Sequence, residues 1–242
     1  MKGVVLAGGL GTRLAPMTRV TNKHLLPVYD RPMIFYPIQT LVGAGITDIL
    51  LVSGGNHAGD FLRLLGNGKD FGLKHLHYTY QEGEGGIAAA LALAQDFADG
   101  EPICVVLGDN ILQRSIRPAL ERYAARGRGG MILLKEVPDP ERFGVPVFEG
   151  QRIVRIEEKP KAPRSRWAVI GVYVYDARVF DIIATLKPSG RGELEITDVN
   201  NQYLAWGDLD YGYVDGWWTD AGSIESLYRA TCLVATERSE GR

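Results

Sequence analysis

The stretch K-G-V-V-L-A-G-G-L-G-T-R-L at residues 2–14 decides how the rest of the chain is interpreted. Its apolar run, V-V-L-A at residues 4–7, is short enough for a buried strand. The run opens into a loop that contains Gly8, Gly9 and Gly11. Without a Cβ in the way, the backbone N–H groups of such a loop can approach a phosphate closely. The loop alone fits two structures, a tight turn after a strand or a cradle for a phosphate group.

Neither of the common nucleotide-binding loop patterns is present. A P-loop needs G-x-x-x-x-G-K-[ST], and the dinucleotide pattern G-x-G-x-x-G needs a glycine where this chain has Leu14. Arg13 and Lys23 can bring positive charge to an anion at the loop, although both side chains can equally be solvated. The choice between turn and phosphate cradle therefore depends on the rest of the chain.

Composition indicates an ordinary globular protein. The 242 residues are 45% hydrophobic and carry a formal net charge of −2, which is ample for a core and gives no reason to expect nucleic acid or an anionic membrane as a partner. The apolar opening is too short for a signal peptide and no run reaches transmembrane length, so we expect a cytoplasmic protein. Cys104 and Cys232 show no metal-ligand spacing.

Strand-like and helix-like patterns alternate up to residue 136. This rhythm predicts an α/β fold, with a Rossmann-like, mixed but mostly parallel central sheet and helices on both faces. We expect strands at 3–7, 48–53, 74–80, 103–107 and 131–135, and helices at 33–42, 57–65, 86–97 and 116–125. Beyond residue 136 we expect a hairpin at 145–156, strands at 167–175 and 210–214, and helices at 179–186, 193–206 and 223–236. No linker is evident, so we expect a single domain over residues 1–242.

Two carboxylates follow the ends of predicted strands. Asp109 comes after the buried run I-C-V-V-L, and Asp220 stands in W-W-T-D-A-G-S. Either could cap a helix or make a turn. In sheets of this kind, however, ligands gather beyond the carboxyl ends of the strands. Two carboxylates beside a phosphate cradle would suit Mg²⁺, which takes one or two carboxylates together with substrate phosphates.

Four further residues could bind a second anion or a base. Glu158 and Lys159, in the turn I-E-E-K-P, could hold the hydroxyls and the phosphate of a phosphosugar, or could simply be solvated. Arg191, between two glycines, could bind phosphate or cap a carbonyl group. Gln81 ends a strand and could read a base edge with both its donor and its acceptor, or be an ordinary polar residue there.

Taken together, the sequence resembles the sugar-phosphate nucleotidyltransferase family over nearly its whole length. Within that family it is most similar to the branch that transfers a thymidylyl group to glucose 1-phosphate. The resemblance rests on L-A-G-G-L-G-T-R-L-A-P-M-T at 6–18, N-K-H-L-L-P-V-Y-D-R-P-M-I at 22–34, V-V-L-G-D-N at 105–110, P-E-R-F-G-V at 140–145, I-E-E-K-P-K at 156–161, A-V-I-G-V-Y-V-Y-D at 168–176, R-G-E-L-E-I-T-D-V-N at 191–200 and W-W-T-D-A-G-S at 217–223.

The resemblance implies a reaction between dTTP and glucose 1-phosphate that gives dTDP-glucose and pyrophosphate, with Mg²⁺ as cofactor. It implies a nucleotide-binding half at 1–136, a sugar-binding half at 137–242, and a homo-oligomer, either dimer or tetramer. The implied nucleotide-binding residues are Leu6, Gly8, Gly9, Gly11, Thr12, Arg13, Lys23, Gln81, Gly86 and Asp109. The implied residues for the sugar phosphate are Asn110, Gly144, Glu158, Lys159, Val169, Tyr173, Arg191 and Trp218. Catalysis would fall to Arg13, Lys23, Asp109, Lys159 and Asp220, with Asp109 and Asp220 as metal ligands.

The chain departs from the commonest family pattern at the base loop and beside the lysine. The base loop reads Q-E-G-E-G-G-I at 81–87 where many members have a serine-proline-aspartate-glycine-leucine run, and His24 replaces a common glutamine. The thymine and uracil bases differ by one methyl group, worth about 1–3 kcal/mol in a fitted pocket. Use of UTP or of another hexose 1-phosphate therefore stays open, as does a non-catalytic sugar-nucleotide sensor. A nicotinamide-dependent oxidoreductase is disfavoured by the missing third glycine.

Overall fold

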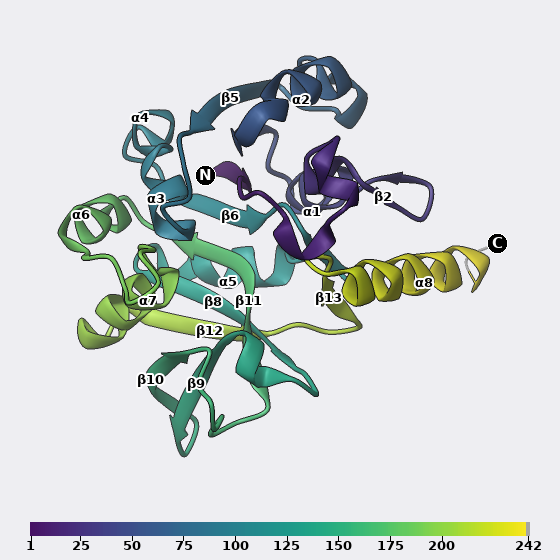
Figure 1. The fold of residues 1–242 in the computed structure, drawn as a ribbon. Coiled ribbons are helices and arrows are strands. Elements are labelled where there is room, and N and C mark those ends of the chain that lie inside the picture. Colours follow the sequence, from purple (N-terminus) through teal and green to yellow (C-terminus); the bar gives the residue numbers. More distant parts are fainter. Residues whose placement is uncertain (241–242) are drawn as a thin grey trace.

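A nine-stranded sheet forms the centre of the protein, with helices on both faces (Figure 1). The computed structural model describes residues 1–240. The strands of the sheet are β1 (Lys2–Ala7), β4 (Asp48–Gly54), β5 (His75–Gln81), β6 (Ile103–Leu107), β8 (Gly130–Glu136), β9 (Gly144–Glu149), β10 (Arg152–Glu158), β11 (Trp167–Tyr175) and β12 (Leu209–Tyr213). The helices are α1 (Phe35–Gly43), α2 (Ala58–Leu65), α3 (Ile87–Ala92), α4 (Gln95–Ala98), α5 (Arg117–Arg126), α6 (Arg178–Thr185), α7 (Ile196–Ala205) and α8 (Ile224–Glu240).

The expected mixed, mostly parallel sheet is confirmed. Strands β6, β1, β4 and β5 lie side by side and parallel, in that order. The antiparallel strand β11 joins this group to β8, and β12 runs parallel to β8. The hairpin of β9 and β10 also attaches to β11, through the pairing of Val169 with Gly144 (Figure 1). Strands from both implied halves of the chain thus share one sheet.

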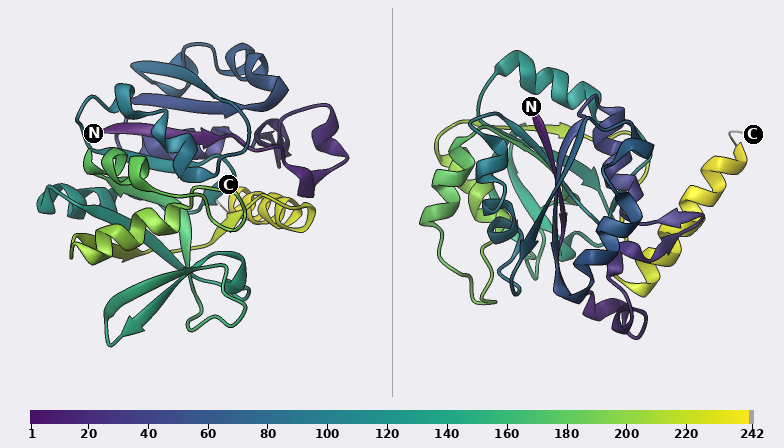
Figure 2. Two further views of the ribbon diagram at one scale, coloured as in Figure 1. Left: turned by 60° about the vertical axis from the view of Figure 1, so that its left-hand side comes forward. Right: turned by 90° about the horizontal axis from the view of Figure 1, so that it is seen from above.

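Helices on both faces explain why the central strands read as continuous apolar runs. In β1, Val4 and Leu6 pack beneath α3, α6 and α7, whereas Val5 and Ala7 pack on the other side beneath α1, α2 and α5. Figure 2 shows the two helical layers on either side of the strands. Because the residues of the central strands face one helical layer or the other, these strands are continuous apolar runs, whereas the outer strands β5 and β10 keep exposed residues.

Three predicted helices differ from the structure by more than a residue or two, and one of them is α8, which was expected to end at residue 236 and continues to Glu240. The expected helix at 86–97 is two short helices, α3 and α4, because Leu93 and Ala94 bond to carbonyls three residues back and tighten the chain. The helix expected at 193–206 begins only at Ile196. The backbone before Ile196 does not join the helix, because the N–H of Leu194 donates instead to the carbonyl of Gly85.

Two small two-stranded sheets lie outside the main sheet. One pairs β7 (Asn110–Leu112) with β13 (Trp218–Asp220), and the other pairs β2 (Pro27–Val28) with β3 (Arg31–Pro32). Helix α8 packs against both small sheets through a separate apolar cluster, which includes Val28 of β2, Ile111 of β7 and Ala230 of α8. The far end of α8 extends away from the body of the protein (Figures 1 and 2).

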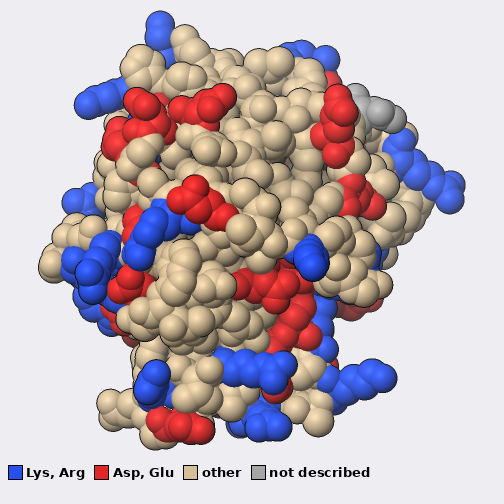
Figure 3. All heavy atoms as spheres, turned by 90° about the vertical axis from the view of Figure 1, so that its left-hand side faces the viewer, with Lys and Arg blue, Asp and Glu red and all other residues tan. Residues whose placement is uncertain are grey.

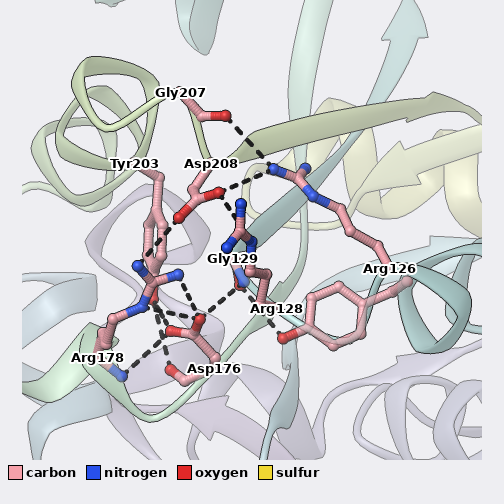
Figure 4. Close-up of polar contacts among 9 residues, drawn as sticks. Arg126, Arg128, Gly129, Asp176, Arg178, Tyr203, Gly207 and Asp208 are labelled. Atoms are coloured by element: carbon pink, nitrogen blue, oxygen red, sulfur yellow. Dashed lines mark hydrogen bonds and ion pairs between the residues drawn. The ribbon is translucent and has the colours of Figure 1, made fainter.

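A polar network closes the end of the sheet where β11 ends and β8 and β12 begin (Figure 4). Asp176 accepts bonds from Arg178 at 2.6 Å, from the N–H of Gly129 at 2.7 Å and from the hydroxyl of Tyr203 at 2.8 Å. Arg178 also bonds to Asp208 at 3.0 Å. These contacts tie together α6, α7 and the edge strands, far from the carboxyl ends of β1 and β6.

The surface over α3, α6 and α7 carries interspersed acidic and basic side chains (Figure 3).

Over residues 1–240, no helix combines the length and the apolar character needed to cross a membrane.

Candidate active site

A cavity of about 560 Å³ opens at the carboxyl ends of β1 and β6 and extends to the β9–β10 hairpin and the start of α7. The structure brings almost all of the predicted site residues to its wall. These are Leu6, Gly8, Gly9, Thr12, Arg13, Lys23, Gln81, Gly86, Asp109, Asn110, Gly144, Glu158, Lys159, Val169, Tyr173, Arg191, Trp218 and Asp220. The convergence follows from topology, because the carboxyl ends of parallel strands meet at one edge of the sheet.

Gly11 is the exception among the predicted residues, since it does not line the cavity. Its backbone is left-handed, with φ of 65°, and a Cβ there would lie 2.9 Å from both Lys23 Cβ and Thr18 Cγ2. Gly11 therefore acts by letting the glycine loop pack tightly against the turn that carries Lys23.

The glycine loop also touches the loop that follows β5. A Cβ on Gly8 would lie 2.5 Å from Oε1 of Gln81, so a larger residue there would have to displace this side chain. Gln81 is buried, and its Nε2 donates to the carbonyl of Gly86 at 3.4 Å. Gly86 has a φ of 89°, and a Cβ there would lie 2.7 Å from the carbonyl oxygen of Leu194. Glycine at position 86 thus lets the loop after β5 pack directly against the backbone of Leu194.

The two predicted metal ligands lie near one another at the ends of β6 and β13. Strands β7 and β13 place Asp220 opposite Asn110, and the N–H of Ala221 donates to the carbonyl of Asp109 at 2.8 Å. A Cβ on Gly222 would lie 3.3 Å from Oδ2 of Asp109 and 3.4 Å from Oδ2 of Asp220. Both carboxylates therefore border the same point. β13 was not anticipated from the sequence, and its pairing with β7 is what creates this arrangement.

This donor set suits a hard cation such as Mg²⁺. Two carboxylate oxygens converge, and residues 1–240 supply no cluster of three or more histidine, cysteine or acidic side chains that could enclose a metal. Mg²⁺ typically binds through one or two carboxylates and keeps its other positions for water and phosphate oxygens. Asp109 and Asp220 could therefore hold Mg²⁺ together with a phosphate-bearing ligand.

Each of these carboxylates is already paired with a cation. Lys23 Nζ lies 2.6 Å from Oδ2 of Asp109. Burial alone would raise the pKa of Asp109, but the Lys23 ammonium and its hydrogen bond hold that pKa below its usual range. The pKa of Asp220 is raised, first by burial and then by the nearby charge of Asp109. Arg142 offsets part of this effect, since its Nη2 lies 3.0 Å from Oδ2 of Asp220.

Arg142 is a site residue that the sequence analysis missed. It lines the cavity, bonds to Asp139 at 2.7 Å and lies over the ring of Phe143, 5.3 Å from its centroid. Phe143 in turn packs edge-on against Trp218, with ring centroids 5.3 Å apart. The available signal was an arginine beside an aromatic residue in P-E-R-F-G-V, a segment noted only for its resemblance.

Asn110 organises the middle of the cavity. Its Oδ1 accepts from the N–H of Gly171 at 3.0 Å and from Nε1 of Trp218 at 2.8 Å, while its Nδ2 donates to Asp109 at 3.1 Å. A Cβ on Gly171 would lie 2.6 Å from that Nδ2, so glycine is needed for β11 to approach. Asn110 thereby orients Asp109, a candidate metal ligand, and holds Gly171 and Trp218 in the wall of the cavity.

The hairpin end of the cavity is rich in charge. Glu158 accepts a bond from Thr197 at 2.5 Å and from Arg191 at 3.3 Å, and Lys159 Nζ lies 3.6 Å from the same carboxylate. Lys159 has a φ of 43°, a costly conformation for a residue with a Cβ, and its N–H bonds to the carbonyl of Phe143. The strained backbone thus belongs to Lys159, a residue that lines the cavity.

Within residues 1–240, Arg191 does not cap a carbonyl group, one of the two alternatives that the sequence left open. Its Nη2 bonds to Glu195 at 2.8 Å and lies 3.3 Å from Glu158 and from Glu193, so it pairs with carboxylates and caps no carbonyl group in the residues described. It still lines the cavity, where it could reach an arriving phosphate. Four further wall residues from this region were missed, and they are Glu193, Glu195, Thr197 and Asn200.

His24 is almost completely buried at the cavity floor, against Gly108. Burial, followed by the charge of Lys23, lowers its pKa to about 3. Its Nδ1 lies 2.8 Å from Oδ1 of Asn22, which also accepts from the N–H of His24. His24 is therefore neutral at physiological pH and serves to position the Lys23 turn.

Fold and site together define a class of protein that brings two phosphorylated ligands together beside a pair of carboxylates. Comparison with known proteins agrees, because the nucleotidyl transferase family model matches residues 2–237. The chain belongs to the nucleotidyl transferase family.

Several relatives are similar over nearly the whole chain. A glucose-1-phosphate thymidylyltransferase of Neisseria meningitidis serogroup A is 47% identical, covering 98% of this chain and 83% of that protein. One from an Actinoplanes species is 43% identical, covering 100% and 80%. A Bacillus anthracis structure described as a glucose-1-phosphate thymidylyltransferase in complex with a sucrose is 51% identical, with a TM-score of 0.92 and coverage of 96% and 94%. A UDP-glucose pyrophosphorylase at 23% identity and a TM-score of 0.84 shares the fold.

Proposed function

We propose that this protein transfers a thymidylyl group from dTTP to glucose 1-phosphate, releasing dTDP-glucose and pyrophosphate. The observation that carries the proposal is the position of Asp109 and Asp220, which converge between a glycine loop at one end of the cavity and the Glu158–Lys159 pair at the other. The named activity of relatives that match almost the whole chain supports the same substrates.

The chemistry needs positioning more than proton transfer. The phosphate oxygen of the sugar phosphate is already anionic at neutral pH, so it can attack the α-phosphorus without a general base. A new P–O bond forms to the sugar phosphate, and the bond between the α-phosphorus and the bridging oxygen breaks as pyrophosphate leaves. The barrier lies in bringing two polyanions into line, which fixed cations and backbone N–H groups can lower.

The residues of the site divide this work. The loop of Gly8 and Gly9, with Thr12 and Arg13, would hold the triphosphate. Gln81 and Gly86 would contact the thymine. Asp109 and Asp220 would hold Mg²⁺, which when bound supplies charge neutralisation at the phosphates. Lys23 lies 2.6 Å from Asp109 and would turn its ammonium group towards the phosphate oxygens when the nucleotide binds.

The sugar phosphate would occupy the hairpin end. Glu158 would accept bonds from hexose hydroxyls, and Lys159 and Arg191 would bind the phosphate. Asn110, Gly144, Val169, Tyr173 and Trp218 would complete the walls around the hexose. Burial holds the pKa of Tyr173 well above its usual value, so its hydroxyl stays a neutral hydrogen-bonding group.

A substrate panel tests the proposal directly. Pyrophosphate release is measured with dTTP, UTP, ATP and GTP against glucose, galactose and mannose 1-phosphates. We expect dTTP with glucose 1-phosphate to give the highest kcat/KM, and a clear preference for UTP would contradict the thymidylyl assignment. Asp109→Asn serves as the control, because negligible turnover in both it and the wild type would favour a non-catalytic sensor.

We further propose a cytoplasmic homo-oligomer, dimer or tetramer. The support is family resemblance together with apolar side chains on α8, where Ile224 and Tyr228 are 48% and 72% exposed. Sedimentation that shows only monomer at micromolar concentration would contradict the oligomer.

A further inference from the structure

Two loops that come from separate strands touch across the carboxyl end of β4. One is the glycine loop after β1, and the other joins β5 to α3. A Cβ on Gly54, at the end of β4, would lie 3.2 Å from the carbonyl oxygen of Gln81 and 3.6 Å from Cα of Gly8. Beyond this close approach, Oε1 of Glu84 accepts a hydrogen bond of 3.2 Å from the N–H of Leu10. A carboxylate therefore occupies a backbone donor of the glycine loop.

The charge of Glu84 is not matched by a neighbouring cation. Its side chain lines the cavity at the end where the glycine loop lies. Asp109, Asp220 and Glu158 each form an ion pair with lysine or arginine. Glu84 forms none with any residue from 1 to 240. Negative charge without compensation is unexpected in a cavity end that would bind a triphosphate.

We propose that Glu84 is an internal competitor for the phosphates at the glycine loop. Its carboxylate holds the N–H of Leu10 until the nucleotide arrives, and it returns to that N–H when pyrophosphate leaves. The proposal rests on the proposed function, because it assumes that the glycine loop binds the β- and γ-phosphates of a nucleotide. It assigns Glu84 a role in setting the affinity of the site for polyphosphate.

The direction of the effect follows from charge and hydrogen-bond geometry. Leu10 lies in the loop between Gly9 and Thr12, which both line the cavity, and its N–H cannot make a good bond to Glu84 and to a phosphate oxygen at the same time. A nucleotide whose phosphates use this N–H therefore has to displace the carboxylate. The displaced carboxylate stays tethered to the same short loop and repels the phosphates. Because the contact is exposed and screened by solvent, we expect a modest effect, about three- to tenfold in the dissociation constant.

Binding measurements on matched variants test this role. Calorimetric titration with inorganic pyrophosphate, and separately with dTTP, compares wild type, Glu84→Gln and Glu82→Gln. Glu84→Gln keeps an acceptor oxygen but removes its charge, which weakens the bond to Leu10. Glu82 lies two residues away in the same exposed loop, and its neutralisation changes the net charge equally while leaving the contact between Glu84 and Leu10 untouched. We expect Glu84→Gln to bind both ligands about three- to tenfold more tightly, and Glu82→Gln to change the dissociation constants by less than about twofold.

Equal affinities in Glu84→Gln and Glu82→Gln, or weaker binding in Glu84→Gln, would overturn the competition. A wild type that binds neither ligand would contradict the proposed function, and the competition with it. Amide hydrogen exchange on the ligand-free protein separates these outcomes. Because Glu84 protects the N–H of Leu10, this amide exchanges faster in Glu84→Ala than in wild type, whether or not any nucleotide binds. An unchanged exchange rate at Leu10 in Glu84→Ala would show that Glu84 does not bind this N–H, and would overturn the proposal.

Discussion

Lys23 and Asp109 form a largely buried ion pair, with 2.6 Å between Nζ and Oδ2 and only 15% and 16% of the two side chains exposed. The sequence had suggested separate roles for these residues, one towards phosphate and one towards metal. Their pairing means that each keeps the other charged and in place while the site is free of ligand. Removing either partner should therefore affect stability as well as activity.

Replacing Lys23 by methionine should separate these two effects. We expect kcat/KM to fall by about 100-fold or more, because a cation at the reacting phosphates is lost. Urea unfolding should show a loss of about 3 kcal/mol, since Asp109 is left buried without a counterion. The double variant Lys23→Met with Asp109→Asn should recover most of that stability and none of the activity. Strictly additive stability losses would show that the pair is not coupled.

Asp220→Asn should weaken metal binding more than nucleotide binding. Removing one of the two converging carboxylates should raise the dissociation constant for Mn²⁺ in the nucleotide complex by about tenfold or more. The measurement is Mn²⁺ titration followed by electron paramagnetic resonance, which does not depend on turnover. Asp215→Asn is the matched control, because Asp215 is exposed and five residues away in sequence. Equal Mn²⁺ affinity in the two variants would exclude Asp220 as a ligand.

His24 should make stability depend on pH. Its pKa falls from 6.5 to about 3 on folding, so the unfolded chain takes up a proton before the folded protein does. This contribution is complete above pH 6.5 and is lost as the pH falls towards 3, at up to ~1.4 kcal/mol per pH unit. Between pH 7.5 and pH 5, wild type should lose about 2 kcal/mol more than His24→Gln in urea unfolding. The same loss in both proteins would contradict a neutral, buried His24.

Gly86→Ala should damage the loop that carries Gln81. The new Cβ would meet the carbonyl oxygen of Leu194 at 2.7 Å, and the φ of 89° is unfavourable for alanine. We expect a loss of about 2 kcal/mol in unfolding free energy and an increased KM for the nucleotide. Gly190→Ala is the control, since nothing lies within 4 Å of its Cβ position. A Gly86→Ala protein with wild-type stability would show that the loop can move freely.

Asp176→Ala should reduce stability and leave catalysis intact. It would remove the acceptor of Arg178, Gly129 and Tyr203 at the end of the sheet away from the cavity (Figure 4). We expect a loss of about 2–4 kcal/mol in thermal or urea unfolding, because buried donors lose their partner. The kcat and KM measured at 20 °C should stay within about twofold of wild type. A selective fall in kcat would mean that the network communicates with the site.

The sequence predicted the residues whose positions follow from strand ends. The glycine loop and Asp109 come after runs that read as buried strands, Gln81 ends a strand of alternating character, and parallel order brings such strand ends together. Trp167–Tyr175 was predicted with its observed bounds because both its faces are buried and it is uniformly apolar. The α/β class followed from the same rhythm.

The residues that were missed depend on contacts between distant segments. Arg142 reaches Asp220 across the cavity, and no local pattern encodes a partner so far away in the sequence. Thr197 and Asn200 lie near the start of α7 and line the cavity, but no local pattern shows which face of this helix meets the β9–β10 hairpin. Gly11 was assigned to phosphate although its Cα faces the turn of Lys23, a close packing that only coordinates reveal.

The bond between Leu194 and Gly85 has a consequence for divergence within the family. The end of the cavity proposed to bind the hexose is lined from β9, β10 and the start of α7, whereas the end proposed to bind the base is lined from the loop after β5. The strands of these segments are separated in the sheet by β11, β6, β1 and β4, but the backbone just before α7 bonds to the loop after β5 through the N–H of Leu194 and the carbonyl of Gly85. Substitutions at either end therefore have to stay compatible with this contact. We expect a lineage built on this scaffold to change residues on both sides of the Leu194–Gly85 bond together when either end of the cavity changes.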